Sequence, residues 1–92
     1  MVLEFDEAKN AKNVSERGIS FERFADLDVE TAVSSEDARK DYGEQRLRVL
    51  GFIDGVLHAA VVTPRGEKIR VISLRRANRR EERAYAKERQ SS

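Results

Sequence analysis

The sequence predicts an α+β domain, in which two helices lead, an antiparallel β-meander follows and a helix ends the chain. Three observations predict this class. Helix-capping residues punctuate the first part of the chain, two strand-like runs flank Asp54-Gly55, and the segment after Asn78 has the charge order of a helix. Ninety-two residues are enough for one domain and not for two. We therefore expect a single domain spanning residues 1–92.

The first elements are a short strand and a helix. Val2–Asp6 alternates apolar and acidic residues, which is typical of a strand. Asp6 is suited to cap a helix that runs to about Arg17, where Gly18 provides the stop.

A second, shorter helix is expected from about Phe21 to Leu27, with Ser20 as its N-cap. Val29–Val33 is expected to form a brief strand. Ser34–Gln45 is polar, acidic and without periodicity, so we expect an exposed loop there.

The meander is expected from residue 46 onward. Arg46–Ile53 and Val56–Thr63 are strand-like runs joined by Asp54-Gly55, a dipeptide that favours a type I′ hairpin turn. Pro64-Arg65-Gly66 predicts a second turn, and Glu67–Leu74 a third strand. The middle run is apolar at both alternating sets of positions, which is typical of a strand covered on both faces.

The last helix is expected from about Asn78 to Arg89. Asn78 and Glu81 have the spacing of a capping box. The helix is very polar, and such a helix is often completed by a partner.

The charge is divided unevenly along the chain. Residues 1–45 hold 6 Lys/Arg against 12 Asp/Glu, and residues 46–92 hold 12 against 5. Between Arg65 and Arg80 the only acid is Glu67, and the basic residues are Arg65, Lys68, Arg70, Arg75, Arg76, Arg79 and Arg80. Arginine grips phosphate in a bidentate manner and stacks on bases. This pattern favours a polyanion-binding surface, most simply for RNA; the alternative is a solvated charged face.

Several classes of protein are excluded or disfavoured. The chain has no cysteine, so it forms neither a disulfide nor a thiolate metal site, and its single histidine argues against zinc. We expect no metal and no cofactor. No membrane-spanning run or signal peptide is visible, so we expect a soluble cytoplasmic protein.

The arginines are expected to converge from one turn, one strand end and one helix start. RNA carries its own nucleophile, the 2′-hydroxyl, so a cleaving protein needs to position it, move protons and stabilise the charged phosphorane. Preorganised arginine supplies that stabilisation. Because arginine stays protonated, it does not move protons.

The acid or base must then come from another residue, and the candidates are Glu44, Glu81, Tyr85 and His58. His58 is of the usual type for proton transfer, but its place among apolar residues in a strand also fits a structural role. Tyr85 has three readings: it stacks on a base, donates a proton, or anchors the last helix to the sheet.

Several motifs resemble the BrnT family, the ribonuclease toxins of bacterial type II toxin–antitoxin pairs. The most specific is Arg70-Val71-Ile72-Ser73-Leu74-Arg75-Arg76-Ala77, which continues through Asn78-Arg79-Arg80-Glu81 to Tyr85. The turn Thr63-Pro64-Arg65-Gly66 and the triplet Glu44-Gln45-Arg46 also match the family, as do Phe5-Asp6, Lys9, Asn13 and Gly18-Ile19-Ser20-Phe21-Glu22. The resemblance spans nearly the whole chain.

The resemblance implies a RelE-like fold and metal-independent RNA cleavage that arrests translation. It also implies a BrnA antitoxin with a ribbon-helix-helix DNA-binding part, a heterotetramer, and contact with operator DNA only through the antitoxin. The implied catalytic residues are Arg65, Arg75, Arg80 and Tyr85. The implied RNA-binding residues are Arg46, Arg70, Arg76 and Arg79, and the possible acids or bases are Glu44 and His58.

One departure from the family concerns proton transfer. Many members carry Lys-His-Gly where this chain has Glu16-Arg17-Gly18. This departure motivates one alternative to a ribonuclease, a non-catalytic module that docks RNA or an acidic partner. A further possibility is that the basic surface serves the antitoxin as much as RNA.

Overall fold

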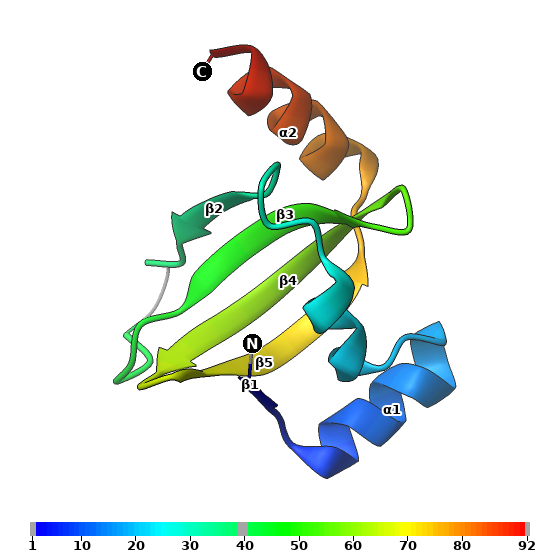
Figure 1. Cartoon of the computed structure of the whole chain (residues 1–92), viewed down its shortest axis with the longest axis vertical. Helices are drawn as coiled ribbons and strands as arrows, with labels where there is room; N and C mark the ends of the chain where they lie inside the picture. The colour runs from blue at the N-terminus through cyan, green and yellow to red at the C-terminus, as the bar shows by residue number, and fades with distance from the viewer. Residues whose placement is uncertain (1, 39–40, 92) are drawn as a thin grey trace.

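A five-stranded mixed sheet forms the centre of the molecule, with the strand order β1-β5-β4-β3-β2. The computed structural model describes residues 2–38 and 41–91. Its elements, shown in Figure 1, are β1 (Val2–Glu4), α1 (Glu7–Arg17), the 3₁₀-helix η1 (Phe21–Asp26), β2 (Val33–Glu36), β3 (Leu47–Ile53), β4 (Val56–Arg65), β5 (Lys68–Arg76) and α2 (Arg79–Ser91). No described helix is both long and apolar enough to cross a membrane.

The predicted antiparallel meander is confirmed for β3, β4 and β5. Its first turn has positive φ angles at Asp54 (50°) and Gly55 (77°), as a type I′ turn requires. The sheet extends beyond the meander at both edges, because β2 pairs antiparallel with β3 and β1 pairs parallel with β5. The sheet is therefore mixed rather than purely antiparallel.

Both ends of α1 follow the prediction. The side chain of Asp6 accepts a hydrogen bond from the backbone N–H of Lys9 at 3.0 Å. Gly18 has a φ of 71°, and its N–H donates to the carbonyl of Val14 at 2.8 Å. A residue without a side chain adopts this left-handed conformation at no steric cost.

The prediction of a second α-helix is wrong in type, because the segment is a 3₁₀-helix. Ser20 caps it as expected, with its hydroxyl accepting from the N–H of Glu22 at 3.2 Å. Phe21, Phe24 and Leu27 are spaced by three, and a helix with three residues per turn brings such residues to one side. All three are at least 95% buried, so burial of this triplet favours the tighter helix.

The predicted strand Val29–Val33 is also wrong. The strand begins at Val33 and continues to Glu36, within the segment Ser34–Gln45 that was expected to be a loop. It lies at the edge of the sheet, where polar side chains reach solvent and backbone pairing with β3 outweighs their weak strand preference. Residues 39 and 40 of the expected loop lie outside the described residues.

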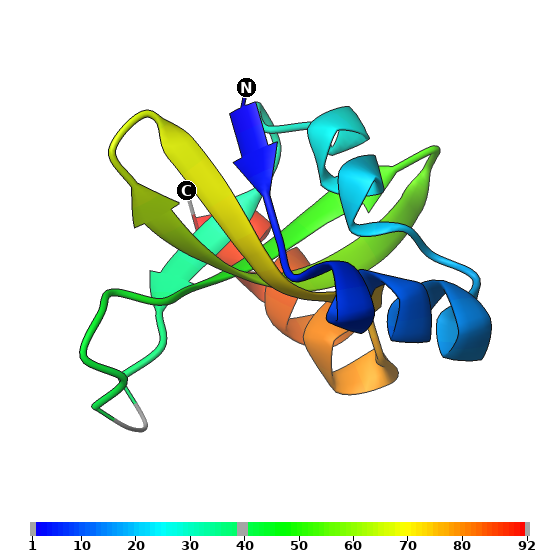
Figure 2. The same ribbon diagram turned by 90° about the horizontal axis from the view of Figure 1, so that it is seen from below.

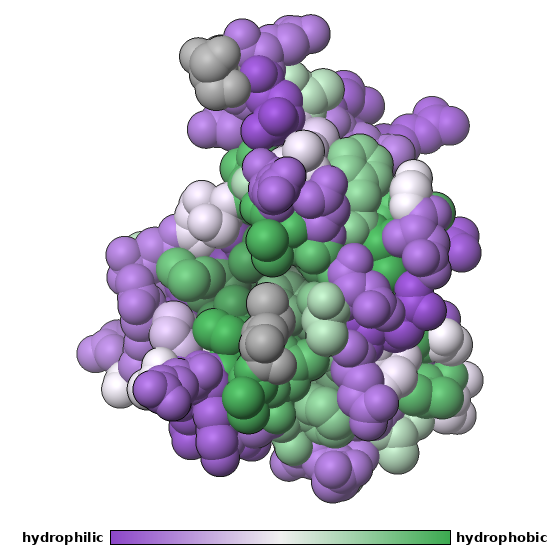
Figure 3. Space-filling view, viewed as in Figure 1, coloured by the Kyte–Doolittle hydropathy of each residue, from purple (hydrophilic) through white to green (hydrophobic). Residues whose placement is uncertain are grey.

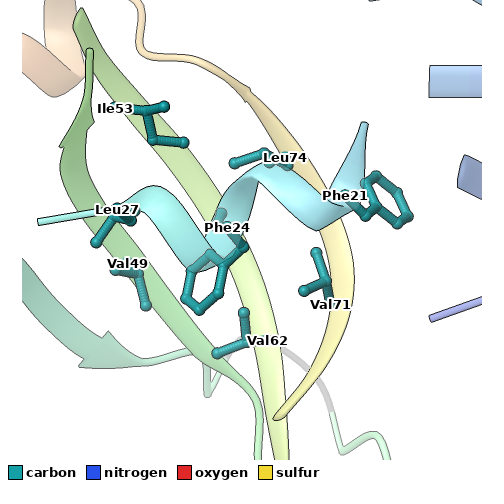
Figure 4. Close-up of a cluster of buried hydrophobic side chains, with 9 residues drawn as sticks. Phe21, Phe24, Leu27, Val49, Ile53, Val62, Val71 and Leu74 are labelled. Carbon is teal, nitrogen blue, oxygen red and sulfur yellow. The ribbon is translucent and has the colours of Figure 1, made fainter. Parts of the chain in front are cut away.

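One side of the sheet, here called the core face, packs against η1. Figure 4 shows Phe24 and Leu27 lying over Val49 of β3 and Val62 of β4, and Phe21 lying beside β5. Gly51 of β3 permits this close approach, because a Cβ atom there would lie 2.6 Å from a methyl carbon of Leu27.

Asn13 attaches α1 to the core face. It is buried, and its amide group donates to the carbonyls of Leu74 at 2.9 Å and Ile19 at 2.8 Å. Its side-chain oxygen accepts from Arg17 at 3.0 Å. A buried polar group so fully bonded holds the helix in one position on the sheet.

The helix that packs on the opposite side, here called the far face, is α2. Figure 2 shows η1 and α2 on opposite sides of the sheet. None of the α2 side chains described is buried. Figure 3, which is viewed from the side of η1, shows hydrophilic residues over α2 and apolar residues over the middle of the molecule.

Candidate functional site

The far face carries most of the arginines that the sequence singled out. Residues opposite one another in a sheet share a face. Arg75 is opposite Ala59, and Arg48 is opposite Val61, whereas the neighbouring Ala60 and Val62 belong to the core. The guanidinium groups of Arg48 in β3 and Arg75 in β5 thus lie on the face away from η1.

A β-bulge brings Arg70 to the same face. Arg70 and Arg75 are five residues apart, which would place them on opposite faces of a regular strand. The register skips Ile72, since Val61 pairs with Ser73 and Val62 with Val71. The extra residue reverses the alternation, so that Arg70, opposite Thr63, shares the far face with Arg75.

A groove of about 500 Å³ lies between the far face and α2. Leu50, Ala59 and Val61 contribute an apolar floor. The charged residues that line it are Arg48, Arg75, Arg80, Glu81 and Glu88. In such a groove a nucleobase can lie on the apolar floor while a phosphate binds at the basic rim.

Arg75 and Glu81 form the closest ion pair in the groove. The guanidinium donates to both carboxylate oxygens, at 2.8 and 2.9 Å. The hydrogen bonds from Arg75, joined by one from the backbone N–H of Asn78, hold the pKa of Glu81 below its usual value. Glu81 in turn raises the pKa of Arg75. Both groups are therefore charged at neutral pH, and Arg75 is held in one orientation.

The predicted capping box of α2 is confirmed at the same place. Asn78 Oδ1 accepts from the backbone N–H of Glu81 at 2.8 Å, and Glu81 Oε1 accepts from the backbone N–H of Asn78 at 2.9 Å. Glu81 thus caps the start of α2 and also holds Arg75 of β5.

A second group of charges lies where β4 and β5 meet the start of β3. Arg65 approaches Glu44 at 3.3 Å and Glu4 at 3.7 Å, and Arg70 approaches Glu4 at 3.7 Å. Arg46 lies 3.7 Å from Glu44. We call this set the basic end of the far face.

Some buried polar atoms of the basic end make no hydrogen bond to the described residues. Glu4 Oε1, Arg46 Nε and Thr63 Oγ1 are buried and have no hydrogen-bond partner within residues 2–38 and 41–91. Buried polar atoms are normally bonded, so three orphans in one row across the sheet indicate a place where bound water or a ligand completes the set. The loose ion pairs leave these guanidinium groups able to take an anion.

Neither Tyr85 nor Arg79 lines the groove, so neither is placed to bind an anion there. The Tyr85 hydroxyl donates to the carbonyl of Thr31 at 2.8 Å, and its ring packs edge-on against Phe52 with centroids 5.4 Å apart. This geometry fits the anchor among the three roles expected for Tyr85. Arg79 is exposed in the first turn of α2 and lines neither cavity described here.

Arg76 and His58 lie elsewhere. They line a separate cavity of about 290 Å³, here called the edge pocket, together with Arg17 and Arg23. Because Arg75 and Arg76 are neighbours in one strand, their side chains point to opposite faces. The expectation that Arg76 converges on one site with Arg75 and Arg80 is therefore wrong.

Arg48 is the lining residue that the sequence reasoning missed. A usable signal was present, because Arg46 and Arg48 are two residues apart in a strand-like run and so share a face. The prediction included Arg46 through the family motif but otherwise weighed the denser cluster after residue 64.

Among the residues described, no three His, Asp or Glu side chains are grouped so that they could hold a metal ion. A family model described as "Ribonuclease toxin, BrnT, of type II toxin-antitoxin system" matches residues 5–81. No curated protein matches the chain.

Proposed function

The chain belongs to the BrnT family of ribonuclease toxins of type II toxin–antitoxin systems, and on that basis we propose that it cleaves RNA on the far face of its sheet without a metal ion. We further propose that the cleavage arrests translation in the cytoplasm and that the fold is RelE-like. The observation that carries the site is the row of arginines on one face, from Arg80 at α2 to Arg65 at the basic end.

The positive charge is spread over the length of the face. Arg48, Arg75 and Arg80 line the groove, whereas Arg46, Arg65 and Arg70 form the basic end. Glu81 fixes the orientation of Arg75, and Glu44 and Glu4 lie within 3.3–3.7 Å of the arginines of the basic end. Preorganised charge of this kind stabilises a phosphorane without a metal ion, because the donors need no rearrangement as the charge develops.

The reaction follows from the chemistry of RNA. A base takes the proton of the 2′-hydroxyl, and the 2′-oxygen attacks the adjacent phosphorus. The bond from phosphorus to the 5′-oxygen then breaks, and that oxygen takes up a proton. The products are a 2′,3′-cyclic phosphate and a 5′-hydroxyl.

Glu44 is the base that we assign to this reaction. Its carboxylate lies at 3.3 Å from Arg65 and 3.7 Å from Arg46, so it is adjacent to two phosphate-binding groups. Glu81 is less available, since Arg75 and the backbone of Asn78 already occupy its two oxygens. His58 lies in the edge pocket, away from the far face.

The antitoxin partner is proposed to cover the same face. We propose a BrnA-type antitoxin with a ribbon-helix-helix part, which assembles with the toxin as a heterotetramer and carries it to operator DNA. The groove has an apolar floor at Leu50 and Val61 and a basic rim at Arg48 and Arg80. A helix with one apolar and one acidic side fits such a groove. A complex that left Arg65, Arg75 and Arg80 open to solvent would contradict inhibition by masking.

Cleavage assays test the site. Purified protein incubated with RNA in EDTA is expected to cleave, and loss of cleavage in EDTA would contradict the metal-free mechanism. Arg75→Ala/Arg80→Ala is expected to lower the cleavage rate by about 100-fold or more. Arg83→Ala removes the same kind of charge from an exposed position of α2 that lines neither cavity, and it serves as the matched control.

The same assay distinguishes a ribonuclease from the non-catalytic alternative. A binding module would leave RNA intact while binding it with a steep dependence on salt. Glu44→Gln should retain that salt-dependent binding and lose cleavage. Full cleavage by Glu44→Gln would remove Glu44 from the mechanism and leave the arginine assignment standing.

A further inference from the structure

The edge pocket lies on the other side of the end of β5 from the groove. It is bounded by the end of α1, by η1 and by the β3–β4 hairpin, and its polar lining includes Arg17, Arg23, His58 and Arg76. Ile19, Ile53 and Val56 add apolar surface. The proposed cleavage reaction uses none of these residues.

The edge pocket is more positive than the groove. Its lining has three arginines against one acid, Asp54, whereas the groove has three arginines against two acids. Asp54 is already paired with Arg23, which also contacts Asp26 at 3.2 Å. Arg17 bonds only the neutral side chain of Asn13, and Arg76 has no acidic partner among the residues described. Two uncompensated guanidinium groups therefore face one small cavity, which favours a phosphate there.

His58 supplies a polar atom of a different kind. It is 93% buried, and its Nδ1 lies 2.8 Å from the carbonyl oxygen of Val56. A carbonyl only accepts, so Nδ1 carries a proton. In the neutral ring Nε2 is then an acceptor, and no described group bonds to it. A ribose 2′-hydroxyl is a donor that fits such an acceptor, and it distinguishes RNA from DNA.

The two cavities are joined by consecutive residues. Arg75 lines the groove and Arg76 the edge pocket, with their side chains on opposite sides of one strand end. The N–H of Ala77 donates to the carbonyl of Leu57 at 2.9 Å, which fixes this strand end as the ridge between them. An RNA strand that leaves the groove at Arg75 and crosses the end of β5 reaches Arg76 next.

We propose that the edge pocket binds one further nucleotide of the RNA strand that occupies the groove. Arg17 and Arg76 hold its phosphate, and His58 Nε2 accepts a hydrogen bond from its 2′-hydroxyl. The proposal rests on the proposed function in that the ligand is RNA. It adds a binding site remote from the bond that is cut.

A titration with mononucleotides tests the pocket without any cleavage. Adenosine 5′-monophosphate has no internucleotide bond to cut, and the chain has a single histidine, so its ring NMR signals belong to His58. At fixed pH these signals are expected to shift on addition of the nucleotide. Arg76→Ala should weaken the binding by about tenfold, as expected for loss of a charge-assisted hydrogen bond. The 2′-deoxy nucleotide should bind about threefold more weakly, as expected for loss of a neutral hydrogen bond.

Arg17→Ala is a second variant for the same measurement, and Arg83→Ala is the control of equal charge change. Equal affinities for wild type, Arg76→Ala and Arg17→Ala would overturn the phosphate assignment. Equal affinities for the ribose and deoxyribose forms would overturn the role of His58.

Cleavage of a long RNA tests the continuity of the strand. Arg76→Ala is expected to raise KM by about tenfold with kcat unchanged, because it removes binding that is equal in ground state and transition state. On an RNA of about three nucleotides, too short to reach both cavities, it should have no effect. An unchanged KM on the long RNA would overturn the inference while leaving the far-face site intact. Full cleavage by Arg75→Ala/Arg80→Ala would instead remove the proposed groove site, and the mononucleotide result would stand independently.

Discussion

The two faces of the sheet differ in what they hold. The core face buries Phe21 and Phe24 of η1 and its C-cap Leu27, and both polar side-chain atoms of Asn13 are bonded. The far face receives no buried side chain from residues 79–90 of α2, which it holds mainly through Tyr85 and the Arg75–Glu81 pair. The core face thus holds most of the large buried side chains, whereas the arginines of the far face stay partly exposed.

The largest effect on stability is expected from Leu27→Ala on the core face. Leu27 is 95% buried and its side chain packs directly against Gly51, so truncation leaves a cavity. We expect a loss of about 2–5 kcal/mol in the free energy of unfolding, measured by urea titration. Val29→Ala, at an exposed position, is the control and should change it by less than about 0.5 kcal/mol. A loss below 1 kcal/mol for Leu27→Ala would break the contrast between the faces.

Asn13→Ala sharpens the same contrast with a polar residue. It leaves the carbonyls of Leu74 and Ile19 without their donor. The expected loss is about 1–3 kcal/mol, because an unsatisfied buried acceptor costs its desolvation. Lys12→Ala, one position earlier and exposed, is the matched control. Thermal unfolding of both variants checks this, and identical melting temperatures would show that Asn13 does not anchor α1.

Tyr85→Phe examines the attachment of α2 to the far face. It removes the hydrogen bond to Thr31 and keeps the ring against Phe52. We expect a loss of about 1 kcal/mol in stability and unchanged RNA cleavage well below the melting temperature. A tenfold loss of cleavage with unchanged unfolding would instead give Tyr85 a role in the reaction.

The smallest effect on stability is expected from lowering the pH. The pKa of Glu81 is lowered in the folded protein, chiefly by its hydrogen bonds from Arg75. The stability that this pair contributes is therefore present above the usual value of 4.5 and is lost as the pH falls through the lower, folded-state pKa. The pair is partly exposed, so we expect about 0.5 kcal/mol. Glu81→Gln should lose this part of the pH dependence, and an unchanged profile would show that the pair contributes nothing.

The sequence by itself determined the helix caps and the tight hairpin turn. The caps at Asp6, Gly18 and Ser20 and the capping box of α2 are confirmed, as is the turn at Asp54-Gly55. Each depends on atoms within a few residues of one another, so the pattern is complete in the sequence. The matched family also follows from the sequence alone.

Tertiary packing decided which of the arginines act together. The bulge at Ile72 brings Arg70 to the face of Arg75, and alternation sends Arg76 to the edge pocket. It also decided that η1 is a 3₁₀-helix and that β1 lies parallel to β5. These features depend on strand register and burial, which join residues far apart in the chain. A one-residue change of register reverses every side chain of a strand, and no local pattern specifies it.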